Sequence, residues 1–254
     1  MNSLERYSVD LADVRVDYPI YSASGRSLKG VIARTIGGRI GLDGNQKVTV
    51  TALEQISLSL RSGDRLGILG RNGSGKSTLL RVIAGIFEPS GGTARIRGHV
   101  CALLDFSLGM DLEATGYENI LMRSVFLGAT FAEARARAPE IEAFSELGDY
   151  LAFPLRTYSS GMVARLSFSI STVMRPEILV IDEVMGAADA SFGRKAKARV
   201  AELVEQSSIL AFATHDLPAA REFCTRGIVL NQGRIEFDGG IDDAIRAYEN
   251  NVVQ

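Results

Sequence analysis

A glycine-rich segment carries the residue types best suited to hold a phosphate group. It consists of Gly70, Arg71, Asn72, Gly73, Ser74, Gly75, Lys76 and Ser77, with Thr78 after it. The apolar run RLGILG leads into it and the helical pattern STLLRVIAGIF follows, which is the context of a phosphate-binding loop rather than a chance glycine-rich turn. Glycines allow successive backbone N–H groups to face phosphate oxygens at the positive end of a helix. We therefore expect Lys76 to contact the β- and γ-phosphates of ATP, and the Ser77 hydroxyl to bind Mg2+.

A second candidate site is a pair of carboxylates, Asp182 and Glu183, at the end of the apolar run ILVI. A buried strand that ends in acids places them at the carboxyl edge of a sheet, where ligands bind in open α/β folds. We expect Asp182 to help hold Mg2+ and Glu183 to act as the general base that orients and deprotonates the attacking water. Many strands end in an acid, so this interpretation depends on the phosphate loop.

A third candidate is Ser159 with Gly161, in the segment YSSGM that opens the helical run VARLSFSISTVM. Small residues at a helix N-terminus can hold an anion through backbone N–H groups and the helix dipole. The same serine would also serve as an ordinary N-cap. The residues by themselves leave both interpretations open.

The elements that must position these residues follow from the hydrophobic pattern. Continuous apolar runs typical of buried strands occur in RLGILG (65–70), ILVIDE (178–183), SILAFATHD (208–216) and GIVLNQGRIEFDG (227–239). Helical patterns alternate with them, so the sequence predicts an α/β fold with a mostly parallel sheet. The stretch from about 106 to 172 is mainly helical in pattern and reads as an inserted helical subdomain. The glycine-rich, basic stretch from about 19 to 50 reads as an insertion before the core.

Composition excludes several classes of protein. With 254 residues, of which 46% are hydrophobic, the chain can bury the core of one full-sized domain. The net charge of −2 and the interspersed charges give no reason to expect a nucleic-acid partner. Cys101 and Cys224 lie outside any CxxC pattern, which favours buried free thiols in a reducing compartment. The N-terminus lacks the pattern of a signal peptide, and no run reaches about 18 apolar residues, so we expect a cytoplasmic protein.

Five motifs follow one another along the chain: GRNGSGKS, YSSGM, ILVIDE, the loop at 186–189 and His215 in ATHD. In this order they resemble the ATPase subunits of the ABC transporter family, and the resemblance covers nearly the whole chain. The resemblance implies a RecA-like P-loop NTPase core with an antiparallel β edge, spanning 1–254 as one nucleotide-binding domain. It also implies a homodimer in which Ser159 and Gly161 contact the γ-phosphate held by the partner's phosphate loop. His215 would hydrogen-bond the γ-phosphate and Asp189 would connect the two sites, although His215 could also be a polar cap that ends its strand.

Departures from the general family pattern narrow the resemblance. The chain has YSSGM where LSGGQ is common, and Asp105 is the closest candidate for the position where the family has a glutamine. That acid could bind Mg2+-bound water or be a solvated loop residue. The segments TYSSGM, LGMDLEATGYENI and ELGDYL, with the early insertion, resemble the ATPase subunits that export O-antigen and related surface polysaccharides. This implies an integral-membrane transporter subunit as partner, a lipid-linked glycan as substrate and a position on the cytoplasmic face of the bacterial inner membrane. Because the sequence ends at Gln254, we expect no carbohydrate-binding domain after the ATPase.

Two weaker features lie near the N-terminus. Tyr18 is the expected stacking partner of adenine, with Tyr21 as the next choice; the alternative is a core tyrosine on a first strand. Apolar residues recur at helical spacing in 27–36, with Arg26, Lys29 and Arg34 on the other side. This predicts a short basic amphipathic helix, which could lie on its own domain or contact lipid headgroups or the transporter.

Two other functional classes share some of these features. An importer subunit, or a lipid or drug exporter subunit, would have the same ATP-binding residues. A non-transport ABC ATPase of the DNA-repair type would carry a long coiled coil between the phosphate loop and YSSGM, and a translation factor would carry two cassettes. Neither feature is present in this sequence.

Overall fold

The computed structural model describes residues 6–20, 39–42, 48–104, 109–174, 176–182 and 190–252. Several residues singled out in the sequence lie outside these ranges, namely Asp105, Glu183, Asp189, Tyr21 and the predicted helix at 27–36.

The larger of two sheets has six strands in the order β10-β9-β4-β8-β7-β6. Its strands are β4 (Arg65–Leu69), β6 (Val100–Leu103), β7 (Ile178–Asp182), β8 (Ile209–Ala213), β9 (Arg226–Asn231) and β10 (Arg234–Gly240). Neighbouring strands are parallel except β9 and β10, which form an antiparallel hairpin at one edge. The apolar runs predicted as buried strands are the central ones, covered on both faces. The predicted α/β fold with a mostly parallel sheet and an antiparallel edge is confirmed.

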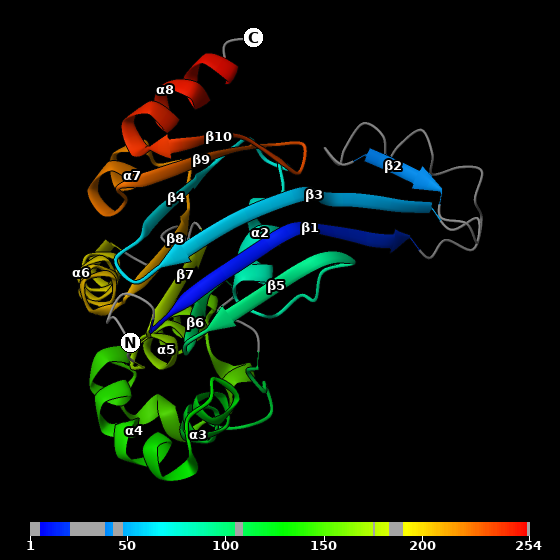
Figure 1. Ribbon diagram of the computed structural model, residues 1–254. Helices are drawn as coiled ribbons and strands as arrows, with labels where there is room; N and C mark the ends of the chain where they lie inside the picture. The colour runs from blue at the N-terminus through cyan, green and yellow to red at the C-terminus, as the bar shows by residue number, and fades with distance from the viewer. Residues whose placement is uncertain are drawn as a thin grey trace.

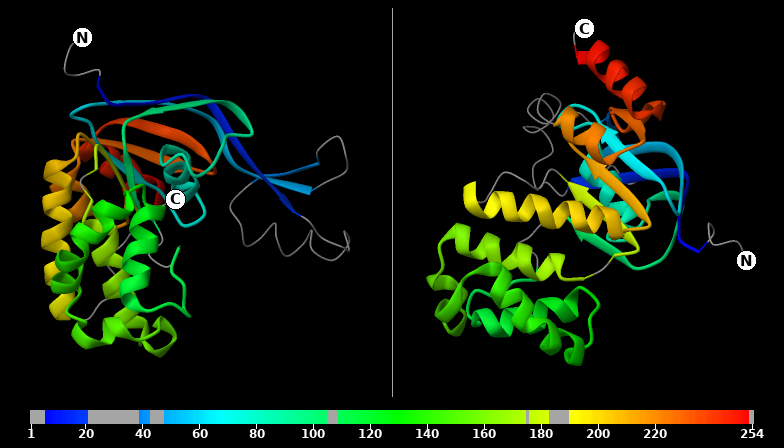
Figure 2. Two further views of the ribbon diagram at one scale, coloured as in Figure 1. Left: turned by 90° about the horizontal axis from the view of Figure 1, so that it is seen from below. Right: turned by 90° about the vertical axis from the view of Figure 1, so that its left-hand side faces the viewer.

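The second sheet is antiparallel and has the strand order β2-β3-β1-β5. Its strands are β1 (Ser8–Ile20), β2 (Arg39–Leu42), β3 (Val48–Arg61) and β5 (Gly91–Arg97). Both β1 and β3 are long, and together with β2 they extend beyond the rest of the molecule as an arm (Figures 1 and 2). The ends of β1 and β3 therefore reach into the stretch that the sequence suggests is an insertion.

The main hydrophobic core lies between the two sheets, where helix α2 (Lys76–Ile83) is buried. Apolar side chains of β1, β3 and α2 pack there against one face of the six-stranded sheet. The other face of that sheet is covered by α6 (Ala190–Gln206), α7 (Leu217–Phe223) and α8 (Ile241–Val252), and by one side of α5 (Ser160–Thr172) (Figure 1). Cys101 and Cys224 are buried free thiols, as predicted, and burial raises the pKa of each to about 12.

A block of helices lies between β6 and β7 in the sequence and occupies one end of the molecule (Figure 1). It contains α3 (Gly116–Phe126), α4 (Phe131–Ser145), α5 and the short 3-10 turns η2 (Gly148–Ala152) and η3 (Leu155–Thr157). Thr115 and Thr130 each form a capping box that fixes where α3 and α4 begin. The block has a small core of its own, which includes Ile120, Ile141 and Leu166.

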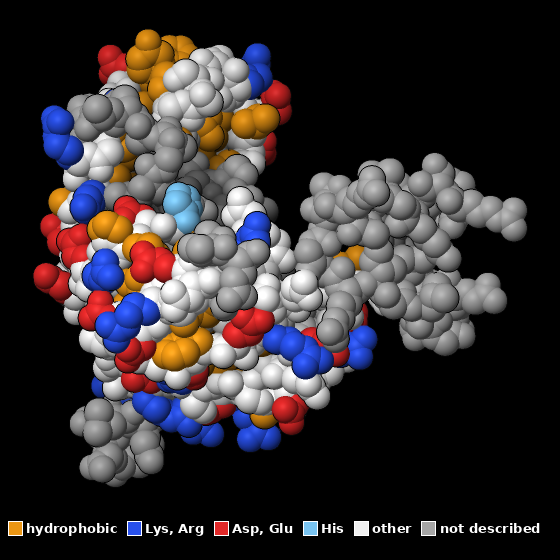
Figure 3. Space-filling view, turned by 90° about the horizontal axis from the view of Figure 1, so that it is seen from above, with side chains coloured by type: hydrophobic (Ala, Val, Ile, Leu, Met, Phe, Trp, Pro, Cys, Tyr) orange, Lys and Arg blue, Asp and Glu red, His pale blue; other side chains and the backbone are white. Residues whose placement is uncertain are grey.

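The surface mixes both charge signs. The view from above shows Lys and Arg side chains interspersed with Asp and Glu, with small apolar areas between them (Figure 3). None of the helices in the described part of the chain combines the length and the apolar character that a membrane span requires.

Candidate nucleotide-binding site

The loop between β4 and α2 has a backbone that only glycine fits at two positions. A Cβ on Gly70 would lie 2.5 Å from the carbonyl oxygen of Leu230, and one on Gly75 would lie 2.8 Å from that of Ala52. Gly75 also has a φ of 109° and is the N-cap of α2, where it can offer no side-chain hydrogen bond to the helix. The first N–H groups of α2 are thus left to bind another acceptor, which is the arrangement that binds anions at helix N-termini.

Lys76 begins α2 and its side chain folds back over the loop. Its Nζ donates hydrogen bonds to the carbonyl oxygens of Gly70, at 2.7 Å, and Arg71, at 3.1 Å. Partial burial lowers the pKa of Lys76, and the nearby carboxylate of Asp182 opposes this shift. The ammonium group is therefore held near the loop and near the strand end that carries Asp182.

A cavity of about 350 Å³ opens over this loop. It is lined by Tyr18, Val50, Ala52, Asn72, Gly73, Gly75, Lys76, Ser77, Thr78 and Asp182. The volume lies in the range of small-molecule sites. Its lining combines apolar residues of β1 and β3 with the polar residues of the loop and of the end of β7. The fold thus brings together the sequence-predicted phosphate, metal and base-stacking candidates of this half of the site.

Ser77, which carries a hydroxyl, and Asp182, which carries a carboxylate, line the same cavity. Both are oxygen donors of the kind that Mg2+ prefers, so the donor set fits this ion.

His215 follows β8, the strand that lies between β4 and β7 in the sheet. Ala213, two positions before it, is paired with Ile68 on one side and with Asp182 on the other. His215 is exposed and lies in a turn held by Asp216, whose side chain caps α7 and whose backbone N–H donates to Thr214 Oγ1 at 2.9 Å. Asp216 therefore caps α7, and His215 lies at the sheet edge between the two strands that lead to the phosphate loop and to Asp182.

Ser159 is the N-cap of α5, which is one of the two roles that the sequence leaves open, and its Oγ accepts a hydrogen bond from Met162 N at 3.2 Å. The preceding Tyr158 donates from its hydroxyl to the carbonyl oxygen of Tyr150 at 2.6 Å, which ties the start of α5 to the turn η2. Ser159 is exposed, and neither it nor Gly161 is among the described residues that line the cavity.

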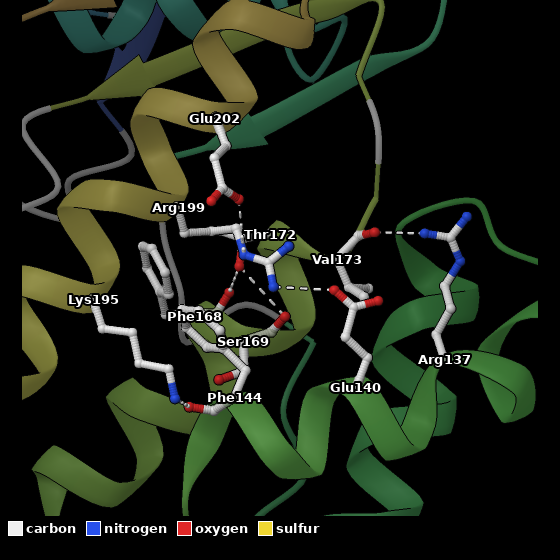
Figure 4. Close-up of polar contacts among 10 residues, drawn as sticks. All are labelled: Arg137, Glu140, Phe144, Phe168, Ser169, Thr172, Val173, Lys195, Arg199 and Glu202. Atoms are coloured by element: carbon white, nitrogen blue, oxygen red, sulfur yellow. Dashed lines mark hydrogen bonds and ion pairs between the residues drawn. The ribbon is translucent and has the colours of Figure 1, made fainter.

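Aromatic and charged side chains of α4, α5 and α6 pack together in a contact that we call the α4–α6 junction (Figure 4). The rings of Phe144, Phe168 and Phe192, from α4, α5 and α6, lie 5.8 to 6.1 Å apart. Lys195 and Arg199 of α6 extend over the ring of Phe144, and Lys195 Nζ also donates to the Phe144 carbonyl oxygen at 2.9 Å. The junction therefore connects the helix that begins at Ser159 to the helix that follows residues 183–189.

Sequence reasoning missed three residues next to the cavity. Val50 and Ala52 line it from β3, and Phe87 packs against Tyr18 with ring centroids 5.8 Å apart. The alternation VTVTAL marks a strand and could have extended β3 into the glycine-rich stretch. Nothing in the sequence connects Phe87 to Tyr18, because the contact forms only in the folded chain.

Comparison with known proteins places this site in a family. The family model described as "ABC transporter" matches residues 53–186, which include the loop, YSSGM and the end of β7. This chain belongs to the ABC transporter family. The chain is therefore an ABC-type ATPase that binds ATP.

Three relatives of this ABC ATPase are export proteins by name. The O-antigen export system ATP-binding protein RfbE of Yersinia enterocolitica is 47% identical over 229 residues, covering 90% of this chain and 96% of RfbE. RfbB of Myxococcus xanthus, of the same description, is 41% identical over 78% of this chain, which spans 46% of that longer protein. The teichoic acids export ATP-binding protein TagH of Staphylococcus saprophyticus is 36% identical over 95% of this chain and 88% of TagH.

Solved structures of ABC cassettes share the fold. The dimeric, post-hydrolysis ATP-binding cassette MJ0796 bound to ADP and Pi matches with a TM-score of 0.66 at 21% identity, over 92% of this chain and 98% of that one. An ATP-binding subunit of an ABC transporter matches with a TM-score of 0.69 at 19% identity, over 97% and 99% of the two chains. At this level of identity the likeness supports the fold.

Proposed function

We propose that this chain is the ATP-hydrolysing subunit of an ABC transporter that exports a surface polysaccharide of O-antigen type. The observation that carries the proposal is the 47% identity to RfbE over almost the full length of both proteins. The similarity to TagH extends it, because TagH is named for the export of another cell-surface polymer. The identity extends over 90% of this chain, so it includes segments outside the ATP-binding motifs that all ABC transporters share.

ATP binds with its phosphates on the loop and its base at the apolar part of the cavity. The first N–H groups of α2 and the ammonium group of Lys76 bind the β- and γ-phosphates, since Lys76 can exchange its carbonyl partners for phosphate oxygens. Tyr18 stacks on adenine beside Val50, its cross-strand neighbour. The cavity thus separates a charged part for the triphosphate from an apolar part for the base.

Hydrolysis requires groups at the carboxyl edge of the sheet. Ser77 and Asp182 would hold Mg2+, which neutralises charge on the phosphate oxygens when it is bound. Glu183, the residue after β7, orients the attacking water and accepts its proton. His215 donates a hydrogen bond to the γ-phosphate from the end of the adjacent strand.

Two copies of the chain complete each other's sites. Ser159 and Gly161 do not line the cavity of their own chain within its described part, so their exposed helix N-terminus is free to meet the triphosphate of a second copy. Asp189 connects the two sites across this interface. The arrangement is a symmetric homodimer with two equivalent nucleotides.

The partner in the membrane is an integral-membrane transporter subunit, which docks on the helical block. A hollow of about 420 Å³ on α3 and the start of α4 is lined by Leu121, Met122 and Phe131, with Asp111, Glu113 and Glu118 around them. Phe131 is 67% exposed there. An apolar hollow with acidic neighbours suits a short amphipathic helix that carries basic residues. The ATPase is then held on the cytoplasmic face of the inner membrane, with a lipid-linked glycan as the transported substrate and no role for nucleic acid.

A single variant tests export directly. In the source bacterium, Lys76→Ala should abolish ATP hydrolysis, so surface polysaccharide should disappear while lipid-linked glycan accumulates inside the cell. The control is Lys197→Ala, which removes an exposed ion pair between α6 and Glu222 of α7 and should leave both readouts unchanged. Normal surface polysaccharide in the Lys76→Ala strain would favour the alternative, an importer or a lipid or drug exporter.

A further inference from the structure

Tyr18 is held at both ends of its side chain. It lies on β1 opposite Val50, it is half-buried, and it lines the cavity. Its hydroxyl lies 3.3 Å from Thr78 Oγ1, on the helix that follows the phosphate loop. This hydrogen bond fixes the far end of the side chain, but it leaves the plane of the ring free to rotate about the long axis.

Phe87 supplies the missing constraint. Helix α2 ends at Ile83, and Gly85 just after it has a φ of 70°. The chain turns back there, so that Phe87 N donates to the carbonyl oxygen of Arg81 at 3.1 Å. The ring of Phe87 then meets Tyr18 edge to face, with an interplanar angle of 72°. The guanidinium of Arg81 lies 5.5 Å from the centroid of the Phe87 ring. Arg81 and Phe87 thus form a support behind Tyr18. This support is attached to α2, the helix that directly follows the phosphate loop.

We propose that Phe87 is a positioning residue for the nucleotide base, because it holds the Tyr18 ring in the plane in which that ring stacks on adenine. The inference rests on the proposed function, in which Tyr18 contacts the base of ATP. An aromatic ring fixed before binding loses little freedom when the base arrives, so the support increases affinity without touching the nucleotide. Because Arg81 lies in α2, the helix that follows the phosphate loop, the support also keeps the Tyr18 ring at a fixed position relative to that loop.

Since Phe87 also packs against the main core, the test must separate base recognition from folding. The change Phe87→Ala should weaken ATP binding by about threefold to tenfold, which is the range of one aromatic pair. It should raise the KM for ATP and leave kcat unchanged. Binding of ribose 5′-triphosphate, which has no base, should not change. Equal losses of affinity for ATP and for ribose 5′-triphosphate would overturn the inference, because they would mean that Phe87 supports the phosphate loop and not the Tyr18 ring.

Two conservative variants act as matched controls. Phe87→Leu keeps an apolar side chain of similar size, so a packing role would be fully restored by it, whereas the proposed role would not. Phe87→Tyr keeps the ring and should restore the wild-type affinity for ATP. Recovery of ATP affinity in Phe87→Leu equal to that in Phe87→Tyr would overturn the inference.

A double-mutant cycle with Tyr18→Ala distinguishes this inference from the proposed function. Tyr18→Ala by itself should weaken ATP binding, and adding Phe87→Ala to it should cause no further loss. If Tyr18→Ala leaves ATP affinity unchanged, the proposed base contact is wrong and the inference falls with it. If Tyr18→Ala weakens binding but Phe87→Ala does not, only the role of Phe87 is wrong.

Discussion

The two ends of the proposed ATP site are built in different ways. At the phosphate end, the backbone itself makes the site: the loop lies between a strand that is buried after its first residue and a largely buried helix, and Gly70 and Gly75 have no room for a side chain. At the Ser159 end, side chains determine the geometry, through the hydrogen bond from Tyr158 to Tyr150 and through the α4–α6 junction. The first end is fixed within one core, whereas the second belongs to a block with a core of its own.

The contacts that join the helical block to α6 are partly exposed. Lys195 lies 2.7 Å from Glu146, and Arg199 lies 3.0 Å from Glu140; in each pair the carboxylate side chain is about half exposed. Pairs of this kind contribute about 0 to 1 kcal/mol each, much less than the burial of a core side chain. We infer that the phosphate end is rigid, whereas at the Ser159 end these ion pairs add little to the packing of the buried rings of Phe168 and Phe192.

The largest expected effect is at the phosphate end. Glu183→Gln should lower the rate of ATP hydrolysis by about 10²- to 10⁴-fold, since it removes the general base and leaves the charge of the loop unchanged. ATP binding should persist, and ATP-bound dimers should accumulate in gel filtration. Near-normal hydrolysis by this variant would refute the role of Glu183.

The next effect tests the rigidity of the loop. Gly75→Ala places a Cβ 2.8 Å from the Ala52 carbonyl oxygen at a positive φ, so ATP affinity should fall by about 10- to 100-fold as the loop distorts. Gly63→Ala is the matched control, because its φ of 99° is similarly unfavourable but no atom lies within 4 Å of the added methyl group. It should lose stability in a thermal melt and keep its ATP affinity. Unchanged ATP affinity in Gly75→Ala would mean that the loop is not held rigidly.

A smaller effect is expected at the α4–α6 junction. Phe144→Ala removes the ring that contacts Phe168, Phe192, Lys195 and Arg199, so the start of α5 should be less well positioned. We expect the hydrolysis rate to fall about threefold to tenfold while ATP binding to a single subunit is unchanged. Phe126→Ala, at a ring that is 67% exposed, should change neither. A loss of ATP binding in Phe144→Ala would show that the two ends of the site are not independent.

The smallest effect on ATP hydrolysis is expected in the early insertion. Changing Arg26, Lys29 and Arg34 together to Ser should leave the hydrolysis rate of the isolated subunit nearly intact. Export of surface polysaccharide should fall, because basic residues near an anionic membrane surface contribute about 1 kcal/mol each. Both quantities should be measured in the same variant. Intact export, or loss of folding and hydrolysis together, would contradict a role at the membrane.

The sequence predicts the phosphate end well because its signals are local. Glycine spacing, an apolar run and the start of a helix are adjacent in 65–83, so the loop can be recognised without knowing the fold. The junction cannot be predicted this way, because Phe144 and Lys195 are 51 residues apart and each looks like an ordinary helix residue. The start of β3 could not be predicted from the sequence either, because Val48 to Val50 follow a glycine-rich stretch that favours a loop.

The central claim is that each ATP site is completed by the Ser159 end of a second copy of the chain. The most direct test mixes a Lys76→Ala subunit with a Ser159→Arg subunit, each of which should be inactive as a homodimer. A mixed dimer holds one site that carries both changes and one that carries neither. The account predicts that ATP hydrolysis returns in part when the two are mixed. No recovery, in a sample where mixed dimers are demonstrated by differential tags, would contradict it.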